Sequence, residues 1–153
     1  MNNIMGKQED LNMAVSVVYW SGTGNTEKMA QAVAKGIEEA GKEANLLEVG
    51  AADASALAGE DAFALGCPSM GAEQLEEDEM EPFVEALEPL VSGKHILLFG
   101  SYGWGDGEWM REWAERMKNA GAVLVREEGV IANEDPDDDA LEECRAAGSE
   151  LAK

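Results

Sequence analysis

A stretch of seven residues, Trp20–Thr26, combines two glycines with several hydroxyl groups and one amide. The apolar, β-branched run Ala14–Tyr19 precedes it and indicates a buried strand, and Glu27–Ala40 follows with apolar residues at helical spacing. A glycine-rich turn between a strand and a helix gathers backbone N–H groups at the positive end of the helix dipole, which favours an anion such as phosphate. The stretch holds no Lys or Arg, so neutral donors alone would bind that phosphate.

Two common nucleotide-binding motifs do not match this stretch. The nucleoside triphosphatase loop requires a lysine before its Ser or Thr, and none is present. The dinucleotide motif G-x-G-x-x-G fits Gly22 and Gly24, but its third position is Glu27, whose charge would lie near a pyrophosphate. A monophosphate remains as the ligand. The alternative is a tight turn without ligand, in which Thr23 or Asn25 is the helix N-cap.

Two further glycine-rich loops carry large side chains. Residues 66–74 include Met70, which is long and polarizable, and residues 101–107 include Trp104, which lies between two glycines. Taken singly, Met70 is also typical of a gap filler and Trp104 of a loop anchor. Together they would sandwich a planar ring, and Glu73 would accept a hydrogen bond from a ring N–H. A ring and a monophosphate fit flavin mononucleotide (FMN) better than a nucleoside monophosphate.

Length and charge limit the class of protein. The 153 residues predict one domain, residues 13–153, after a disordered extension, residues 1–12, with Met13 as a candidate start. A net charge of −21 argues against nucleic acid and membrane surfaces and favours transient protein partners with basic patches, although solubility alone would also explain it. No apolar stretch resembles a membrane span or a signal peptide, so we expect a cytoplasmic protein. The compact chain has little material for a dimer surface, so we expect a monomer.

The cysteines and the histidine indicate no metal site. Cys67 and Cys144 form no C-x-x-C motif, which predicts two reduced, partly buried thiols with a structural role for Cys67. The single His95 offers neither a metal cluster nor a catalytic triad.

Strands and helices are predicted to alternate along the chain. Alternation implies a parallel sheet with helices on both faces, and ligands of such folds lie beyond the carboxyl ends of the strands, where all three glycine-rich loops fall. The predicted strands are 14–19, 44–49, 61–66, 95–99 and 123–125, and the last of them resumes at 130–131. The predicted helices are 27–40, 53–57, 81–91, 108–120 and 140–152.

Four segments, 18–29, 65–71, 81–83 and 98–107, together resemble the short-chain flavodoxins of clostridia and related anaerobes. The similarity extends from Ala14 to the last predicted helix, and the chain leaves no room for the insertion in the fifth strand that marks long-chain flavodoxins. The resemblance implies a three-layer α/β, flavodoxin-like fold with a five-stranded parallel sheet, order 2-1-3-4-5, helices on both faces, and non-covalently bound FMN.

The resemblance also implies a role for each loop position. The first loop and Ser101 would bind the phosphate, Met70 would cover the inner flavin face and Trp104 the outer, Glu73 would meet the pyrimidine edge, and Asn133 would support the neighbouring loop. The predicted cofactor-binding residues are Trp20, Ser21, Gly22, Thr23, Gly24, Asn25, Thr26, Ser69, Met70, Gly71, Ala72, Glu73, Ser101, Tyr102, Gly103, Trp104, Gly105 and Asn133.

The function implied is that of a low-potential one-electron carrier that cycles between the neutral semiquinone and the anionic hydroquinone of FMN, and not that of an enzyme. In the family, the peptide after the loop glycine, here Gly71–Ala72, turns over so that its carbonyl accepts from flavin N5–H. Two acidic runs, 73–81 and 134–139, would surround the flavin edge and attract basic redox partners, iron–sulfur or flavin oxidoreductases.

Three other readings compete with the carrier. An FMN-dependent quinone or nitro reductase of the same fold is the main alternative, although such enzymes usually carry longer loops. A phospho-receiver domain needs acidic residues after the first strand, and Trp20 stands there instead. An acidic interaction module without cofactor would show no bound flavin.

Overall fold

The computed structural model describes residues 14–153, so the predicted extension 1–12 and Met13 lie outside the described residues. The first strand, β1 (Ala14–Tyr19), is buried at every position after Ala14. The element β4 (His95–Tyr102) is buried from Ile96 to Ser101. Apolar strands that are covered on both faces are typical of a parallel sheet between two helical layers.

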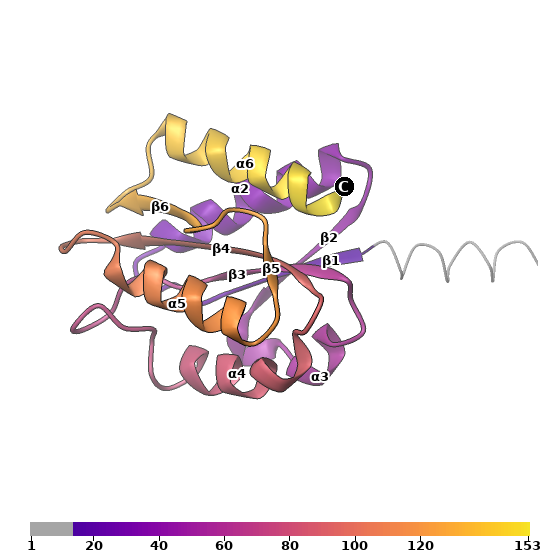
Figure 1. Ribbon diagram of the computed structural model, residues 1–153. Coiled ribbons are helices and arrows are strands. Elements are labelled where there is room, and N and C mark those ends of the chain that lie inside the picture. Colours follow the sequence, from indigo (N-terminus) through magenta and orange to yellow (C-terminus); the bar gives the residue numbers. More distant parts are fainter. Residues whose placement is uncertain (1–13) are drawn as a thin grey trace, which may run out of the picture.

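All strand pairs of the sheet are parallel, in the order β2-β1-β3-β4-β5, as predicted. The register aligns the carboxyl ends, because Tyr19 lies opposite Gly66, and Gly66 opposite Phe99. The loops after β3, β4 and β6 therefore meet at one edge of the sheet (Figure 1). The remaining strands are β2 (Glu43–Glu48), β3 (Ala62–Gly66), β5 (Val123–Leu124) and β6 (Val130–Asn133).

The predicted fifth strand consists of two short strands, β5 and β6, which both pair with β4. Between them the chain turns out of the sheet, where Gly129 has a φ of 70° and its N–H bonds to the carbonyl of Arg126 at 3.1 Å. The second piece resumes at Val130, as the sequence indicated, and continues to Asn133. The sheet thus gains a minor sixth strand without a change of order.

The helices form two layers. Figure 1 shows α2 and α6 on one face of the sheet and α3, α4 and α5 on the other. Each layer encloses its own apolar core, with Met29, Val33 and Ile37 in the first and Trp109 and Trp113 in the second. The helices are α2 (Asn25–Glu39), α3 (Ala54–Leu57), α4 (Met80–Leu87), α5 (Glu108–Asn119) and α6 (Asp138–Ala152), with short 3-10 turns η1 (Val49–Ala51) and η2 (Glu88–Leu90).

Helix boundaries differ from the predicted ones where a local group decides them. Pro89 lies in η2, and the α-helical pattern of α4 ends before it at Leu87 instead of running to Val91, because proline has no N–H for the helix. The carboxylate of Asp137 accepts the N–H of Ala140 at 2.8 Å, and α6 begins directly after this N-cap. Within residues 14–153, no helix has the length and apolar character that crossing a membrane requires.

Candidate cofactor-binding site

The first loop is held by one hydroxyl group. The Oγ atom of Ser21 accepts the N–H groups of Gly24 and Glu27 at 3.1 and 3.2 Å. A hydroxyl that accepts two hydrogen bonds still has its own proton to donate. Gly24 takes the N-cap position of α2 with a φ of 97°, a conformation that suits glycine. The alternative N-cap at Thr23 or Asn25 is therefore wrong.

A pair of hydroxyl groups joins the first loop to the third loop. The hydroxyls of Thr26 and Ser101 lie 3.1 Å apart, and both residues are buried. The N–H of Ser69 donates to the carbonyl of Ser101 at 3.0 Å, which attaches the middle loop to the same point. Hydroxyl groups from α2 and β4 therefore converge where the sequence placed a phosphate.

The middle loop is a narrow turn. Met70 and Gln74 exchange two backbone hydrogen bonds of 2.8 Å each. The turn between them contains Gly71, with a φ of 51°, and Glu73, with a φ of 53°. The backbone hydrogen bonds found in residues 14–153 leave the peptide between Gly71 and Ala72 unbonded. This peptide is at the exposed tip of the loop, and glycine before it lowers the cost of a change of conformation.

Glu73 turns away from the expected ring. Its carboxylate accepts the N–H of Glu108, the first residue of α5, at 3.0 Å. A Cβ atom at Gly105 would lie 2.5 to 2.7 Å from this carboxyl group, so Gly105 covers it closely. Glu73 is 9% exposed and joins the middle loop to the third loop. Its contact with a pyrimidine edge stays a prediction.

The three loops enclose a cleft of about 320 Å³. Pro68 and Glu134, which are not among the predicted cofactor-binding residues, also line it. The predicted residues that line it are Trp20, Ser21, Gly22, Thr23, Asn25, Thr26, Ser69, Met70, Ser101, Tyr102 and Gly103. The predicted residues outside its lining are Gly24, Gly71, Ala72, Glu73, Trp104, Gly105 and Asn133.

Trp104 and Asn133 lie around the cleft rather than in it. Trp104 is 64% exposed, which leaves its ring surface available on the third loop. Asn133 donates its side-chain N–H to the carbonyl of Tyr102 at 3.3 Å and so supports that loop. The N–H of Glu134 donates to the same carbonyl at 2.7 Å. Glu134 was expected at this edge as part of the acidic run 134–139, and its position directly after a strand that ends here is the sequence signal that it also lines the cleft.

Cys67 is a buried connector behind the middle loop. Its Sγ atom accepts the N–H of Glu76 at 3.3 Å, and its carbonyl accepts the indole N–H of Trp109 at 3.1 Å. Burial raises the pKa of the Cys67 thiol to about 12, so the thiol is protonated and unreactive at neutral pH. Burial does the same for Cys144, and both cysteines are free.

Glu76 does not belong to the predicted acidic rim. It is 6% exposed, and its carboxylate accepts the N–H groups of Asp78, Glu79 and Met80 at 2.8 to 2.9 Å, at the start of α4. Burial alone would raise its pKa, but these three hydrogen bonds outweigh burial and lower the pKa below the ordinary value. Glu76 is therefore a charged cap inside the protein.

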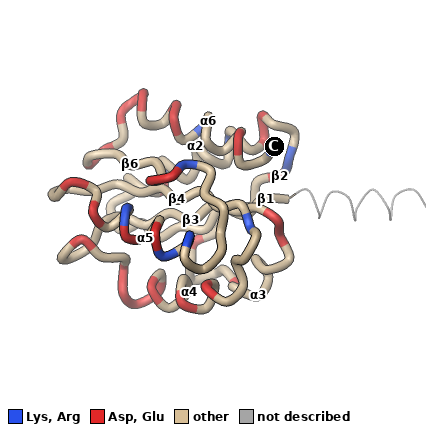
Figure 2. Tube along the Cα trace, in the orientation of Figure 1, with Lys and Arg blue, Asp and Glu red and all other residues tan. Residues whose placement is uncertain are grey.

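The second acidic run is also partly engaged. Asp135 pairs with Lys28 of α2 at 2.7 Å, and Asp137 caps α6. Figure 2 shows acidic positions along the loops at the edge of the sheet that holds the cleft, and on the helices as well. No group of metal-binding side chains occurs in residues 14–153.

Comparison with known proteins decides the family. The flavodoxin family model matches residues 17–148. The chain belongs to the flavodoxin family. It is 49% identical to a flavodoxin of Clostridium beijerinckii over 138 residues, covering 90% of this chain and 99% of that protein. It is 42% identical to a flavodoxin of Megasphaera elsdenii, covering 91% of this chain and 98% of that protein.

A solved structure agrees with this assignment. The solution structure of two-electron reduced Megasphaera elsdenii flavodoxin has a TM-score of 0.80 and 40% identity, covering 90% of this chain and 98% of that chain. The resemblance to short-chain flavodoxins and the predicted fold are confirmed. The protein is an FMN-binding electron carrier, as predicted, because it shares the family of these flavodoxins over most of its length.

Proposed function

We propose that this flavodoxin transfers single electrons at low potential, cycling between the neutral semiquinone and the anionic hydroquinone of FMN. The observation that carries the proposal is the cleft, whose lining combines hydroxyl donors with Met70 and Tyr102 and contains no Lys or Arg. Bound FMN would supply the redox chemistry, and the chain would set its orientation and its electrostatic surroundings.

The phosphate end fits a monophosphate. The hydroxyls of Ser21, Thr23, Thr26 and Ser101 lie on or beside the start of α2, whose N–H groups and dipole favour a dianion there. The neutral donors leave the charge of the phosphate uncompensated by any side chain of the cleft. We therefore assign the phosphate to the first loop and Ser101, with Ser21 donating its free proton.

The middle and third loops offer large side chains for the ring. Met70 would lie on the inner face of a flavin, and the exposed ring of Trp104 would close over the outer face from the third loop. The unbonded peptide at Gly71–Ala72 would be free to turn its carbonyl toward a ring N–H. Such a hydrogen bond contributes on the order of 1 kcal/mol.

Low potential follows from charge. Glu134 lines the cleft and Glu73 lies behind the third loop, whereas no cation lines the cleft. A like charge at roughly 10 Å destabilises an added negative charge by about 0.4 to 1.7 kcal/mol at an effective dielectric constant of about 20 to 80. Several such charges would make formation of the reduced anion unfavourable and lower the second potential.

The partners would be redox proteins with basic docking surfaces, iron–sulfur or flavin oxidoreductases that meet the monomer transiently in the cytoplasm. The net charge of −21 supports fast electrostatic encounter with such surfaces. Nucleic acids and anionic membranes would be repelled by the same charge.

Stepwise dithionite reduction of the FMN-loaded protein tests the proposal. We expect a yellow flavin spectrum that passes through a long-wavelength blue semiquinone band before it bleaches. Bleaching in one step would favour the two-electron reductase, and steady consumption of NAD(P)H by the pure protein would support the same alternative. A colourless protein that takes up no FMN would reject the carrier altogether.

A further inference from the structure

A short strap, residues 133–135, adds to the wall of the cleft where β6 ends. Its middle residue, Glu134, is the only charged residue among residues 14–153 that lines the cleft. On the side of the third loop, the carbonyl of Tyr102 accepts the N–H of Glu134 at 2.7 Å and the side-chain N–H of Asn133 at 3.3 Å. One side of the strap is therefore held by the end of β4.

An ion pair holds the other side of the strap. The ammonium group of Lys28 lies 2.7 Å from a carboxylate oxygen of Asp135, which directly follows Glu134. Lys28 lies one helical turn after Asn25, so the two side chains project from the same side of α2, and Asn25 also lines the cleft. The pair therefore joins two segments of the cleft wall, the start of α2 and the strap.

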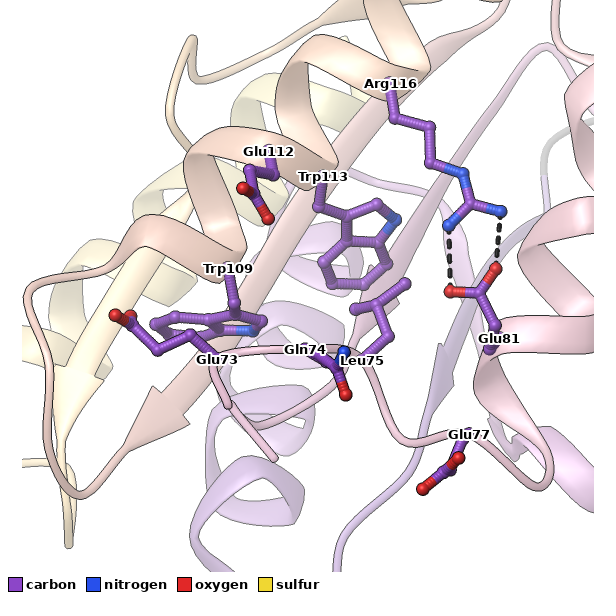
Figure 3. Close-up of a pocket in the computed structure, with 9 residues that line it drawn as sticks. All are labelled: Glu73, Gln74, Leu75, Glu77, Glu81, Trp109, Glu112, Trp113 and Arg116. Atoms are coloured by element: carbon purple, nitrogen blue, oxygen red, sulfur yellow. Dashed lines mark hydrogen bonds and ion pairs between the residues drawn. The ribbon is translucent and has the colours of Figure 1, made fainter. Parts of the chain in front are cut away.

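The position of this ion pair distinguishes it from the others. In the part of the chain that the structure describes, no other ion pair joins two segments that both line the cleft. Arg116 pairs with Glu81 beside a cavity that shares no lining residue with the cleft (Figure 3). Arg126 pairs with Glu150 at 2.7 Å and connects the turn before β6 to the last turn of α6. The Arg126–Glu150 pair thus has the same length as the pair on the strap but lies away from the cleft.

The backbone of the strap depends on its contacts. Glu134 has a φ of 56°, in the left-handed region that a residue with a side chain rarely adopts. Such a conformation is strained and persists where surrounding contacts hold it, often at a binding site. Asp135 precedes the buried Pro136, which favours an extended conformation at Asp135. Without the ion pair, the strained residue would be held from the side of Tyr102 alone.

We propose that Lys28 and Asp135 are positioning residues for the cofactor. Their ion pair holds the strap to α2, keeps Glu134 in the wall of the cleft and slows the release of FMN. Neither residue lines the cleft, so both act through their neighbours Asn25 and Glu134. The inference rests on the assignment of FMN to this cleft. Breaking the pair lets the strap move away from α2, which opens the wall and raises the dissociation rate of FMN.

A direct effect of charge on the phosphate predicts a different result. If the charge of Lys28 attracted the phosphate through space, its removal would speed the release of FMN, whereas removal of the charge of Asp135 would slow it. The ion pair predicts that either change speeds release. The direction of the Asp135 effect therefore separates the two explanations.

The dissociation rate of FMN tests the ion pair. Protein loaded with ¹⁴C-labelled FMN is mixed with a large excess of unlabelled FMN, and the label that stays bound is measured over time by rapid gel filtration. Lys28→Gln and Asp135→Asn are each expected to raise the dissociation rate constant by about two- to fivefold, the range of an exposed ion pair. The double variant keeps the net charge and removes the same single contact, so it is expected to match either single variant.

Two further variants separate position from general stability. Lys28→Arg keeps a full positive charge and is expected to release FMN as slowly as the unsubstituted protein. Glu150→Gln breaks an ion pair of the same length and removes the same charge as Asp135→Asn, and it is expected to leave the rate unchanged. Release from Lys28→Arg as fast as from Lys28→Gln, or from Glu150→Gln as fast as from Asp135→Asn, would overturn the proposal. Slower release from Asp135→Asn, or a double variant in which the single effects cancel or multiply, would also overturn it.

The release experiment does not depend on how many electrons the flavin accepts. If all variants release FMN at the same rate, the positioning role is wrong, and dithionite reduction still decides the one-electron cycle. If reduction bleaches the flavin in one step while Lys28→Gln and Asp135→Asn release FMN faster, the positioning role stands and only the proposed cycle is removed.

Discussion

Glu76 is a single residue on which the geometry behind the middle loop depends. Its carboxylate closes the start of α4 through three backbone N–H groups, and its own N–H bonds to the Sγ atom of Cys67. A carboxylate at the N-terminus of a helix is further stabilised by the helix dipole. The residue thus connects β3, the middle loop and α4.

Glu76→Ala is expected to lower the free energy of unfolding by about 1–3 kcal/mol, because three backbone donors at the start of α4, of which that of Met80 is buried, lose their acceptor. The folded-state pKa of Glu76 is lowered, so its stabilising effect is present above its unfolded-state pKa of about 4.3 and is lost as the pH falls through the lowered value. Urea unfolding at pH 7 and near pH 3 measures the free energy of unfolding of Glu76→Ala and of the unsubstituted protein. The difference between the two proteins should be larger at pH 7 than near pH 3. Glu85→Ala, an exposed change on the same helix, is the control, and a difference that grows toward acid pH would contradict the assignment.

Individual residues also show which features of the site could be predicted from the sequence. The hydroxyls of Ser21 and Thr26 were assigned from the glycine-rich pattern alone, and both line the cleft. The carboxylate of Glu76 was expected on an exposed rim but instead caps a helix, and the carboxylate of Glu73 accepts a helix N–H that the sequence did not indicate, while its contact with a ring edge stays a prediction. Sequence spacing places a side chain in a loop, but which of several nearby donors it binds depends on the folded positions of those donors.

Among the elements, α2 and α6 pack at an unusually short distance. A Cβ atom at Gly148 of α6 would overlap the carbonyl of Val33, and a Cβ atom at Gly36 of α2 would overlap the carbonyl of Arg145. The two glycines therefore allow the helix backbones to touch from both sides. Because α2 starts at the first loop, its position also sets the site that we propose for the phosphate.

Gly148→Ala tests this packing. Alanine favours a helix over glycine by about 1 kcal/mol, but overpacking in a filled interface costs typically about 1–3 kcal/mol. Since the added methyl group would meet backbone rather than a flexible side chain, we expect overpacking to dominate, with lower stability in urea and weaker FMN binding. Ala146→Gly, at an exposed position of α6, measures the propensity alone and should leave FMN binding unchanged. A more stable Gly148→Ala protein would show that the helices can separate without cost.

The elements themselves were largely predictable, and their ends were not. Apolar runs such as 95–99 and the helical spacing in 108–120 predict β4 and α5 because their periodicity reflects burial on one or both faces. The interruption between β5 and β6 gave only a weak signal, since a turn at Gly129 competes with strand pairing that the sequence alone does not show.

At the scale of the whole molecule, charge is the dominant property. The chain has 32 acidic residues against 11 Lys and Arg, and most of these cations already pair with carboxylates in the part of the chain that the structure describes. Acidic positions occur over both helical layers as well as at the loops (Figure 2). The field that a partner meets at long range is therefore that of the whole protein, and the loops only direct its final approach.

Electron transfer from the dithionite-reduced protein to a basic c-type cytochrome should be fast at low ionic strength and should fall by about tenfold or more as salt is added. The reason is screening, since the Debye length shortens from about 30 Å at 0.01 M to about 3 Å at 1 M. Stopped-flow absorbance measures the second-order rate constant, and a neutral quinone acceptor is the control, whose rate should hardly respond to salt. A flat salt profile with the cytochrome would mean that encounter is not electrostatic and that the acidic surface serves solubility. If the rate constant depends steeply on salt and Glu112→Gln and Glu143→Gln reduce it equally, the total charge of the protein causes the effect. If Glu112→Gln reduces the rate constant more than Glu143→Gln, the productive encounter takes place at α5.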